Sequence, residues 1–165
     1  MFGFNRTIIH RNARNGYGGI GFLFKNSVVD MFDISILDAS VKGILWLNLV
    51  HKLEHTVVLP CVCYLPPENS SRTVEYVNGF YEHLLTNIYE YKKEGLIFIC
   101  GDFNSQCGTI DDIIVSVDDV PQRSIIDYGA NYYGELLIDF FINTCTNMIM
   151  LNGWNSSDNN FTSYQ

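Results

Sequence analysis

The sequence predicts a mixed α/β (α+β) domain, and three features of its apolar pattern support that prediction. Two β-rich runs, at 43–50 and 56–64, are separated by a short polar stretch, which is typical of a hairpin. From about residue 73 to residue 94, apolar residues recur every three or four positions, as in an amphipathic helix. Five consecutive apolar residues at 96–100 are too few for a helix and indicate a strand. A chain of 165 residues with this pattern is predicted to form one domain, 1–165.

The first half of the chain is expected to contain four strands. Gly18–Phe24 and Val28–Leu37 are predicted as strands that flank a turn at 25–27. Gly43–Val50 and Thr56–Tyr64 are predicted as a hairpin through the polar loop between them. The prolines that follow Tyr64 are expected to end the last strand.

The predicted helix begins after Ser70-Ser71 and ends before Gly95, two residue types that favour helix termini. Its apolar face comprises Val74, Val77, Tyr81, Leu84, Leu85, Ile88 and Tyr91. The run Leu96–Cys100 that follows is apolar at every position, which predicts a central strand covered on both faces. We expect this strand to be fully buried against the helix.

The last third is expected to be part helix, part loop and part strand. A second helix is predicted around 136–144, with short strands at Met148–Leu151 and Phe161-Thr162. The acidic stretch Asp111–Asp119 is predicted to be a solvated loop, because it lacks the glycine and terminal Glu of a calcium loop.

Composition excludes several classes of protein. The chain is 47% hydrophobic and 17% charged, which excludes intrinsic disorder. No apolar run approaches the roughly 18 residues of a membrane span, and the first ten residues lack the apolar core of a signal peptide. We therefore expect no membrane partner and an intracellular location, with the nucleus as a candidate compartment. The oligomeric state is not predicted.

The charge is unevenly distributed. The net charge is −8, yet residues 1–29 carry +4 and the remainder −12. An acidic total argues against a general nucleic-acid coat protein. The basic first segment is either a solvated segment or an edge that meets a phosphate backbone.

Five cysteines form no CxxC pair, and no histidine lies near them at a zinc-finger spacing. We expect reduced, mostly buried thiols.

The strongest candidates for chemistry stand at two predicted strand ends. Asp102 and Asn104 follow the apolar run, where an Asp can accept a proton or bind a metal and an Asn can donate to a phosphate oxygen. The alternative is that Asp102 only caps a turn. Tyr64, before Leu65-Pro66-Pro67, either points its hydroxyl to the same edge or is an amphipathic residue at the edge of the core.

Taken together, these motifs resemble the endonuclease/exonuclease/phosphatase (DNase I-like) superfamily, and most closely the endonuclease domain of LINE-type retrotransposons. The similar stretches are Gly18–Leu23, Tyr64–Pro67, Gly101–Asn104, Asn131 with Gly134–Leu136, Leu151–Gly153 and Asn160–Thr162. The resemblance implies a four-layered α/β sandwich, incomplete at both termini, and Mg²⁺-dependent hydrolysis of phosphodiesters in DNA.

The resemblance also implies roles for individual residues. Asp102 would orient or deprotonate the attacking water and hold Mg²⁺ weakly. Asn104 and Tyr64 would contact the scissile phosphate, and Thr162 would lie on a strand that touches it or its neighbour. A divalent ion would polarise the phosphoryl oxygen.

Two parts of the family pattern are missing from the chain. Met1–Tyr17 contains no Glu for the main metal ligand, and no Asp-His pair follows Thr162. Whether the chain itself is an active enzyme is therefore open. The alternatives to a DNA endonuclease fragment are a catalytically inactive remnant that acts as a binding module, and a phosphatase or deadenylase of the same superfamily.

Overall fold

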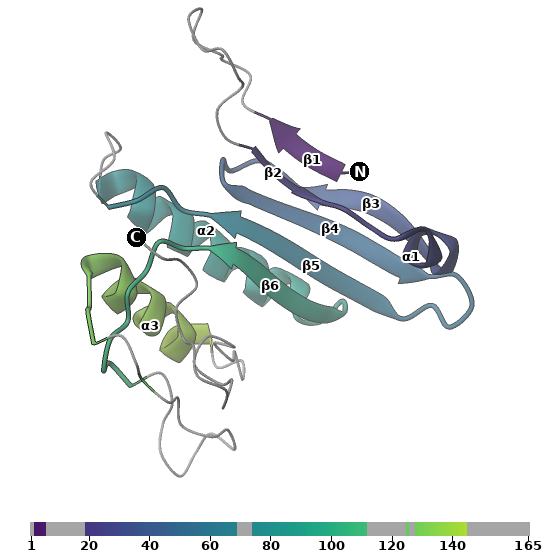
Figure 1. Ribbon diagram of the computed structural model, residues 1–165. Coiled ribbons are helices and arrows are strands. Elements are labelled where there is room, and N and C mark those ends of the chain that lie inside the picture. The colour runs from purple at the N-terminus through teal and green to yellow at the C-terminus, as the bar shows by residue number, and fades with distance from the viewer. Residues whose placement is uncertain (1, 6–18, 69–73, 112–124, 126–127, 145–165) are drawn as a thin grey trace, which may run out of the picture. The chain divides into compact units, whose positions relative to one another are not determined.

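The computed structural model describes residues 2–5, 19–68, 74–111, 125 and 128–144 (Figure 1). Its elements in chain order are β1 Phe2–Asn5, β2 Gly19–Phe22, α1 Asn26–Met31, β3 Phe32–Asp38, β4 Ile44–His51, β5 Val57–Tyr64, α2 Val74–Tyr91, β6 Leu96–Asp102 and α3 Tyr132–Thr144. The mixed α/β class is confirmed.

The chain divides into two compact units. The first unit comprises Met1–Pro66 and Arg72–Asp102, and the second comprises Pro67–Ser71 and Phe103–Gln165. The first unit therefore holds every named strand, and the second holds α3. The single domain predicted from the sequence remains a prediction.

A four-stranded sheet in the order β3-β4-β5-β6 forms the centre of the first unit. β3, β4 and β5 are antiparallel neighbours, whereas β5 and β6 are parallel. A parallel pair needs a long crossover, and α2 lies within it. The predicted hairpin is confirmed as β4 and β5.

β4 is the strand buried on both faces. Leu45, Leu47 and Leu49 pack on one face against β2, through Ile20 and Phe22. The alternate residues of β4 point to the other face, where the Trp46 ring meets the Tyr91 ring of α2 edge-on at 5.3 Å. Within the first unit the sheet thus lies between α2 and β2.

The helix predicted at 73–94 is confirmed as α2. Its buried side chains are Val77, Phe80, Tyr81, Leu84, Asn87, Ile88 and Tyr91. Asn87 is buried because its Oδ1 accepts a hydrogen bond from Trp46 Nε1 at 3.1 Å, which satisfies two polar groups inside the core. The sequence pattern omitted Phe80 and Asn87.

The prediction that 96–100 is a fully buried central strand is wrong. β6 stands at the end of the described sheet, and Leu96 and Phe98 are 67% and 52% exposed. Among the described residues, β6 pairs with β5 along one edge. The face of β6 that carries Leu96 and Phe98 is less covered than either face of β4. A continuous apolar run shows only which residue types are present. Whether those side chains are buried depends on the elements that lie beside the strand.

The turn predicted at 25–27 and the start of the next strand are also wrong, because α1 occupies 26–31. The carbonyl oxygens of Val29 and Asp30 accept hydrogen bonds from Lys52 Nζ at 2.9 and 3.0 Å, and Lys52 N donates to Met31 O at 2.9 Å. A lysine at a helix C-terminus satisfies carbonyl groups that lack helical partners. Because Lys52 belongs to the β4–β5 loop, the sequence around α1 contains no pattern that predicts this contact.

The second helix predicted from the sequence is confirmed as α3. The strands predicted at Met148–Leu151 and Phe161-Thr162 lie outside the described residues, as does most of the acidic stretch after Asp111. No helix in the described part of the chain is long and apolar enough to cross a membrane.

Candidate functional site

Tyr64 and Asp102 are neighbours at one end of the sheet. β5 and β6 are parallel, and Tyr64 pairs in register with Asp102 as their last residues. The backbone continues the ladder, since Leu65 N donates to Asp102 O at 2.9 Å. Adjacent strands are about 4.8 Å apart, so the two side chains start one strand spacing from each other. In Figure 1 the arrowheads of β5 and β6 end side by side.

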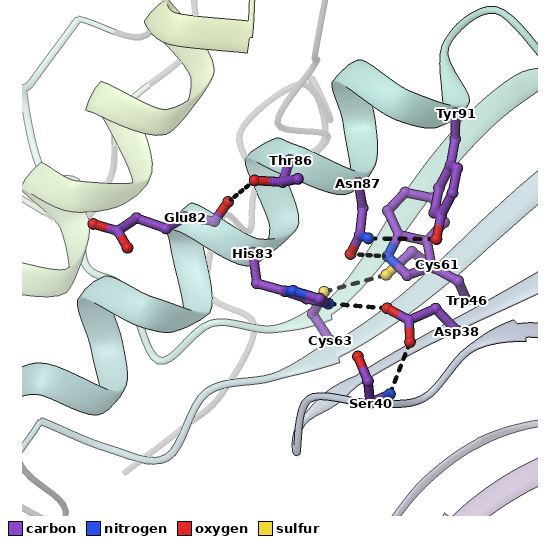
Figure 2. A network of polar contacts seen from close by, with 10 residues as sticks. All are labelled: Asp38, Ser40, Trp46, Cys61, Cys63, Glu82, His83, Thr86, Asn87 and Tyr91. Atoms are coloured by element: carbon purple, nitrogen blue, oxygen red, sulfur yellow. Dashed lines mark hydrogen bonds and ion pairs between the residues drawn. The ribbon is translucent and has the colours of Figure 1, made fainter.

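Both side chains belong to the face of the sheet that points away from α2. Cys61 and Cys63 lie among the side chains of α2 and Trp46 (Figure 2), and side chains alternate along a strand. Tyr64 therefore points to the opposite face, and Asp102, as its in-register partner, shares that face. Tyr64 is 37% exposed and Asp102 is exposed.

The backbone of the Tyr64 strand end is held on both sides by glycines. On the β4 side, Tyr64 N donates to Gly43 O at 2.8 Å, and a Cβ on Gly43 would collide with Tyr64 O. On the β6 side, a Cβ on Gly101 would collide with Cys63 O. Gly43 and Gly101 have φ values of 87° and 142°, in the region that L side chains rarely adopt. Close strand approach thus fixes the backbone that carries Tyr64.

Asn104 belongs to the second unit, two residues after Asp102 in the chain. It has a φ of 48°, a left-handed conformation that Asn tolerates better than most residues. Its carbonyl oxygen accepts a hydrogen bond from Asn131 Nδ2 at 3.1 Å. The loop that begins with Asn104 is therefore tied to the start of α3.

Asn131 organises this loop in the second unit. Its Oδ1 accepts hydrogen bonds from Gln106 N at 2.9 Å and Gly134 N at 2.8 Å. Ser105 Oγ adds a bond to Tyr133 O at 3.0 Å. A Cβ on Gly134 would collide with Gln106 O, so the helix and the loop pack backbone against backbone. One side chain thus sets the shape of the segment that carries Asn104.

A second polar cluster lies between α2 and the sheet (Figure 2). His83 Nε2 and Asp38 Oδ2 are 2.9 Å apart, and Ser40 N donates to Asp38 Oδ1 at 2.8 Å. Burial raises the pKa of Asp38, but the hydrogen bonds from Ser40 and His83 outweigh it and the net pKa is lowered. This cluster is on the α2 face, so it is separate from the face of Tyr64 and Asp102.

The cysteines are consistent with a packing role. Cys61, Cys63, Cys100 and Cys107, the described cysteines, are free, and all except Cys100 are buried. Cys61 Sγ lies 3.6 Å from Cys63 Sγ. Burial strongly raises the pKa of Cys61 and also raises that of Cys100, and a protonated thiol is a poor nucleophile. The prediction that the thiols are mostly buried is confirmed for these four, and their reduced state remains a prediction.

The described residues do not by themselves fit a resident Mg²⁺ ion. At this end of the sheet they supply one carboxylate on the face of Tyr64, that of Asp102, and no group of three His, Cys, Asp or Glu side chains suited to a metal occurs in the described ranges. Mg²⁺ prefers octahedral oxygen coordination through one or two carboxylates, with substrate phosphate and water completing it. We therefore assign no chemical step to the ion.

The structure brings together one pair of the predicted site residues, Tyr64 and Asp102. Asn104 follows in the second unit, and Thr162 lies outside the described residues. The catalytic roles of these residues remain predictions. Comparison with protein-family models, curated proteins and solved structures found no match for this chain.

Sequence reasoning did not predict the contacts of three residues near the strand ends and the loop after Asp102, namely Gly43, Asn131 and Gly134. Gly43 was taken only as the start of a strand, although a glycine at a strand end often marks close backbone approach. Asn131 and Gly134 were noted only through the family resemblance, and their contacts to the loop after Asp102 depend on the tertiary fold.

Proposed function

We propose that this chain carries the phosphodiester-binding part of a DNase I-like endonuclease that acts on DNA, within a four-layered α/β sandwich. The observation that supports this most is the in-register pair of Tyr64 and Asp102 at the carboxyl ends of two parallel strands. Ligands of α/β sheets gather at such ends. The layers of α2, the main sheet and β2 in the first unit agree with part of such a sandwich.

The side chains suit hydrolysis of a phosphate ester. The Tyr64 hydroxyl can donate a hydrogen bond to a phosphate oxygen, and the family resemblance implies the same role for the Asn104 amide. The Asp102 carboxylate can accept a proton from water as its oxygen attacks phosphorus. The bond from phosphorus to the leaving oxygen then breaks, and that oxygen gains a proton. Donors at the equatorial oxygens stabilise the charge that develops there.

Binding of a fluorescent DNA oligonucleotide, measured by anisotropy in EDTA, tests the phosphate site. Tyr64→Phe should weaken binding by about fivefold, the equivalent of one hydrogen bond of about 1 kcal/mol. Asp102→Asn should strengthen binding, because it removes a negative charge that faces the phosphate. Tyr89→Phe on α2 and Asp33→Asn at the opposite end of the sheet make the same chemical changes and should leave affinity unchanged. Equal effects in the test and control variants would contradict the proposal.

Plasmid nicking in MgCl₂ tests whether the 165-residue chain is sufficient for catalysis. We expect little or no nicking, because Asp102 alone holds the ion loosely and residues that act as a unit lose activity together. Robust nicking that Asp102→Ala abolishes would show that we have misjudged which residues the reaction requires. Release of phosphate from a monoester, without nicking, would favour the phosphatase alternative.

A further inference from the structure

The helix α1 is short and buries none of its side chains. It spans six residues, Asn26–Met31, and a helix of this length is unstable in water unless other contacts stabilise it. Lys52 supplies such contacts: its Nζ donates to Val29 O and Asp30 O, and its backbone N donates to Met31 O. The end of α1 therefore depends on the loop between β4 and β5 (Figure 1).

The conformation of this loop depends in part on the side chain of His51, the last residue of β4. Glu54 N donates a hydrogen bond to His51 Nδ1 at 3.1 Å. Two backbone bonds, from His51 N to Thr56 O and from His55 N to His51 O, close the rest of the loop at 2.9 Å each. The His51 ring also packs against the Phe32 ring in a T-shaped arrangement, with the ring centroids 5.0 Å apart. Because Nδ1 accepts a hydrogen bond, the ring proton is on Nε2 and the imidazole is neutral in this conformation.

Protonation of the His51 ring removes the acceptor of this side-chain bond. An imidazolium carries a proton on both nitrogens and accepts no hydrogen bond, so the Glu54 amide then faces a donor. Histidine is the side chain that ordinarily changes charge between about pH 5 and pH 8. The charged and titratable groups of the loop, α1 and β3 around His51 are Lys52, Glu54, His55, Asp30 and Asp33. β2 carries none. His55 titrates in the same range as His51, so a test has to separate the two histidines.

We propose that protonation of His51 loosens the β4–β5 loop and, through Lys52, the end of α1, so that this end of the sheet responds to pH in the range where histidine titrates. Neutral His51 holds the Glu54 amide, and the closed loop holds Lys52 against the carbonyl oxygens of α1. The inference is independent of the proposed function, because Tyr64 lies at the other end of β5.

Amide hydrogen exchange of the 165-residue chain between about pH 5 and pH 8 tests the proposal, with each rate expressed as a protection factor relative to intrinsic exchange at the same pH. Protection of the Glu54 amide should fall about fivefold from the alkaline to the acidic end of this range, the net effect of one lost hydrogen bond. Protection should fall in step at Lys52 and Phe32, whose amides donate to carbonyl oxygens of α1.

Three variants identify the titrating group. His51→Asn offers an amide oxygen that can accept the Glu54 hydrogen bond and does not titrate, so its protection should stay high across the pH range. His51→Ala has no acceptor, so its protection should stay low across the range. His55→Asn is the matched control, because His55 has a φ of 58°, a conformation that Asn tolerates. It should retain the wild-type pH dependence.

Each contrary result overturns a stated part of the proposal. Protection that does not change with pH in the wild type would overturn it as a whole. A pH dependence that persists in His51→Asn, or that disappears in His55→Asn, would overturn the role of His51. A fall at Glu54 alone, with Lys52 and Phe32 unchanged, would overturn the coupling of the loop to α1.

Discussion

Both oxygens of the Asp38 carboxylate have hydrogen-bond partners. One oxygen accepts the Ser40 amide at 2.8 Å, and the other lies 2.9 Å from His83 Nε2. These contacts join the end of β3 to the middle of α2, across 45 residues of sequence. The lowered pKa of Asp38 shows that the fold favours its ionised form.

This preference predicts an acid-sensitive contribution to stability. Because the folded pKa of Asp38 lies below its unfolded value of about 3.9, the stabilisation is fully present above that value and is lost as pH falls through the folded pKa. Asp38→Asn should lower the free energy of unfolding at neutral pH by about 1 to 2 kcal/mol. The difference from wild type, measured by urea denaturation over a pH series, should disappear in strong acid. Asp33→Asn, an exposed change on the same strand, serves as the control, and a pH-independent difference would contradict this account.

At the scale of elements, hydrogen bonds of the Asn131 side chain join the start of α3 to the loop before Gly108. Asn131→Ala removes the side-chain acceptor of the Gln106 amide, and such a lost hydrogen bond is worth about 1 kcal/mol. The Gly134 amide also donates to Asn131 O at 2.9 Å and keeps that backbone bond. Amide hydrogen exchange at Gln106 should therefore quicken by about fivefold, and exchange at Gly134 should change less. Asn131→Asp keeps the acceptor oxygen and should preserve this protection, although it loses the donor to Asn104 O.

Asn143 on α3 provides a matched control for that experiment. Its side chain is exposed and donates to Asp139 O within the same helix. Asn143→Ala should leave exchange at Gln106 and Gly134 unchanged. If it accelerates exchange as much as Asn131→Ala, the loop does not depend on Asn131.

Elements whose signals are local were predictable from the sequence, and those that depend on distant contacts were not. Periodicity located the β4–β5 hairpin and α2, because alternation and the helical repeat are properties of neighbouring residues. The turn predicted at 25–27 failed because Lys52, from a distant loop, caps α1. In the site, strand ends indicated Tyr64 and Asp102, whereas the close approach of Gly43 to Tyr64 depends on the pairing of β4 with β5.

At the scale of the whole molecule, the apolar face of β6 is the feature that bears on solution behaviour. Leu96 and Phe98 are exposed on the last strand of the described sheet. Exposed apolar side chains on such a strand favour pairing with other chains. A charged side chain there opposes this pairing.

Phe98→Lys should therefore reduce self-association of the 165-residue chain, measured by size-exclusion chromatography or sedimentation. The free energy of unfolding should change little, because the ring is already half exposed. Tyr89→Lys introduces the same charge on α2 at an exposed aromatic residue and should not reduce self-association. A marked loss of stability in Phe98→Lys would show that the ring is buried in the folded protein.

The two glycines that flank the end of β5 limit how this sequence can evolve. Any side chain at Gly43 or Gly101 meets the backbone of Tyr64 or Cys63, which cannot rotate aside as a flexible side chain can. Gly79, on α2, has open space around it, so alanine there should be tolerated or even stabilising. We therefore expect random drift to change Gly79 readily and to leave Gly43 and Gly101 in place for as long as selection maintains the fold.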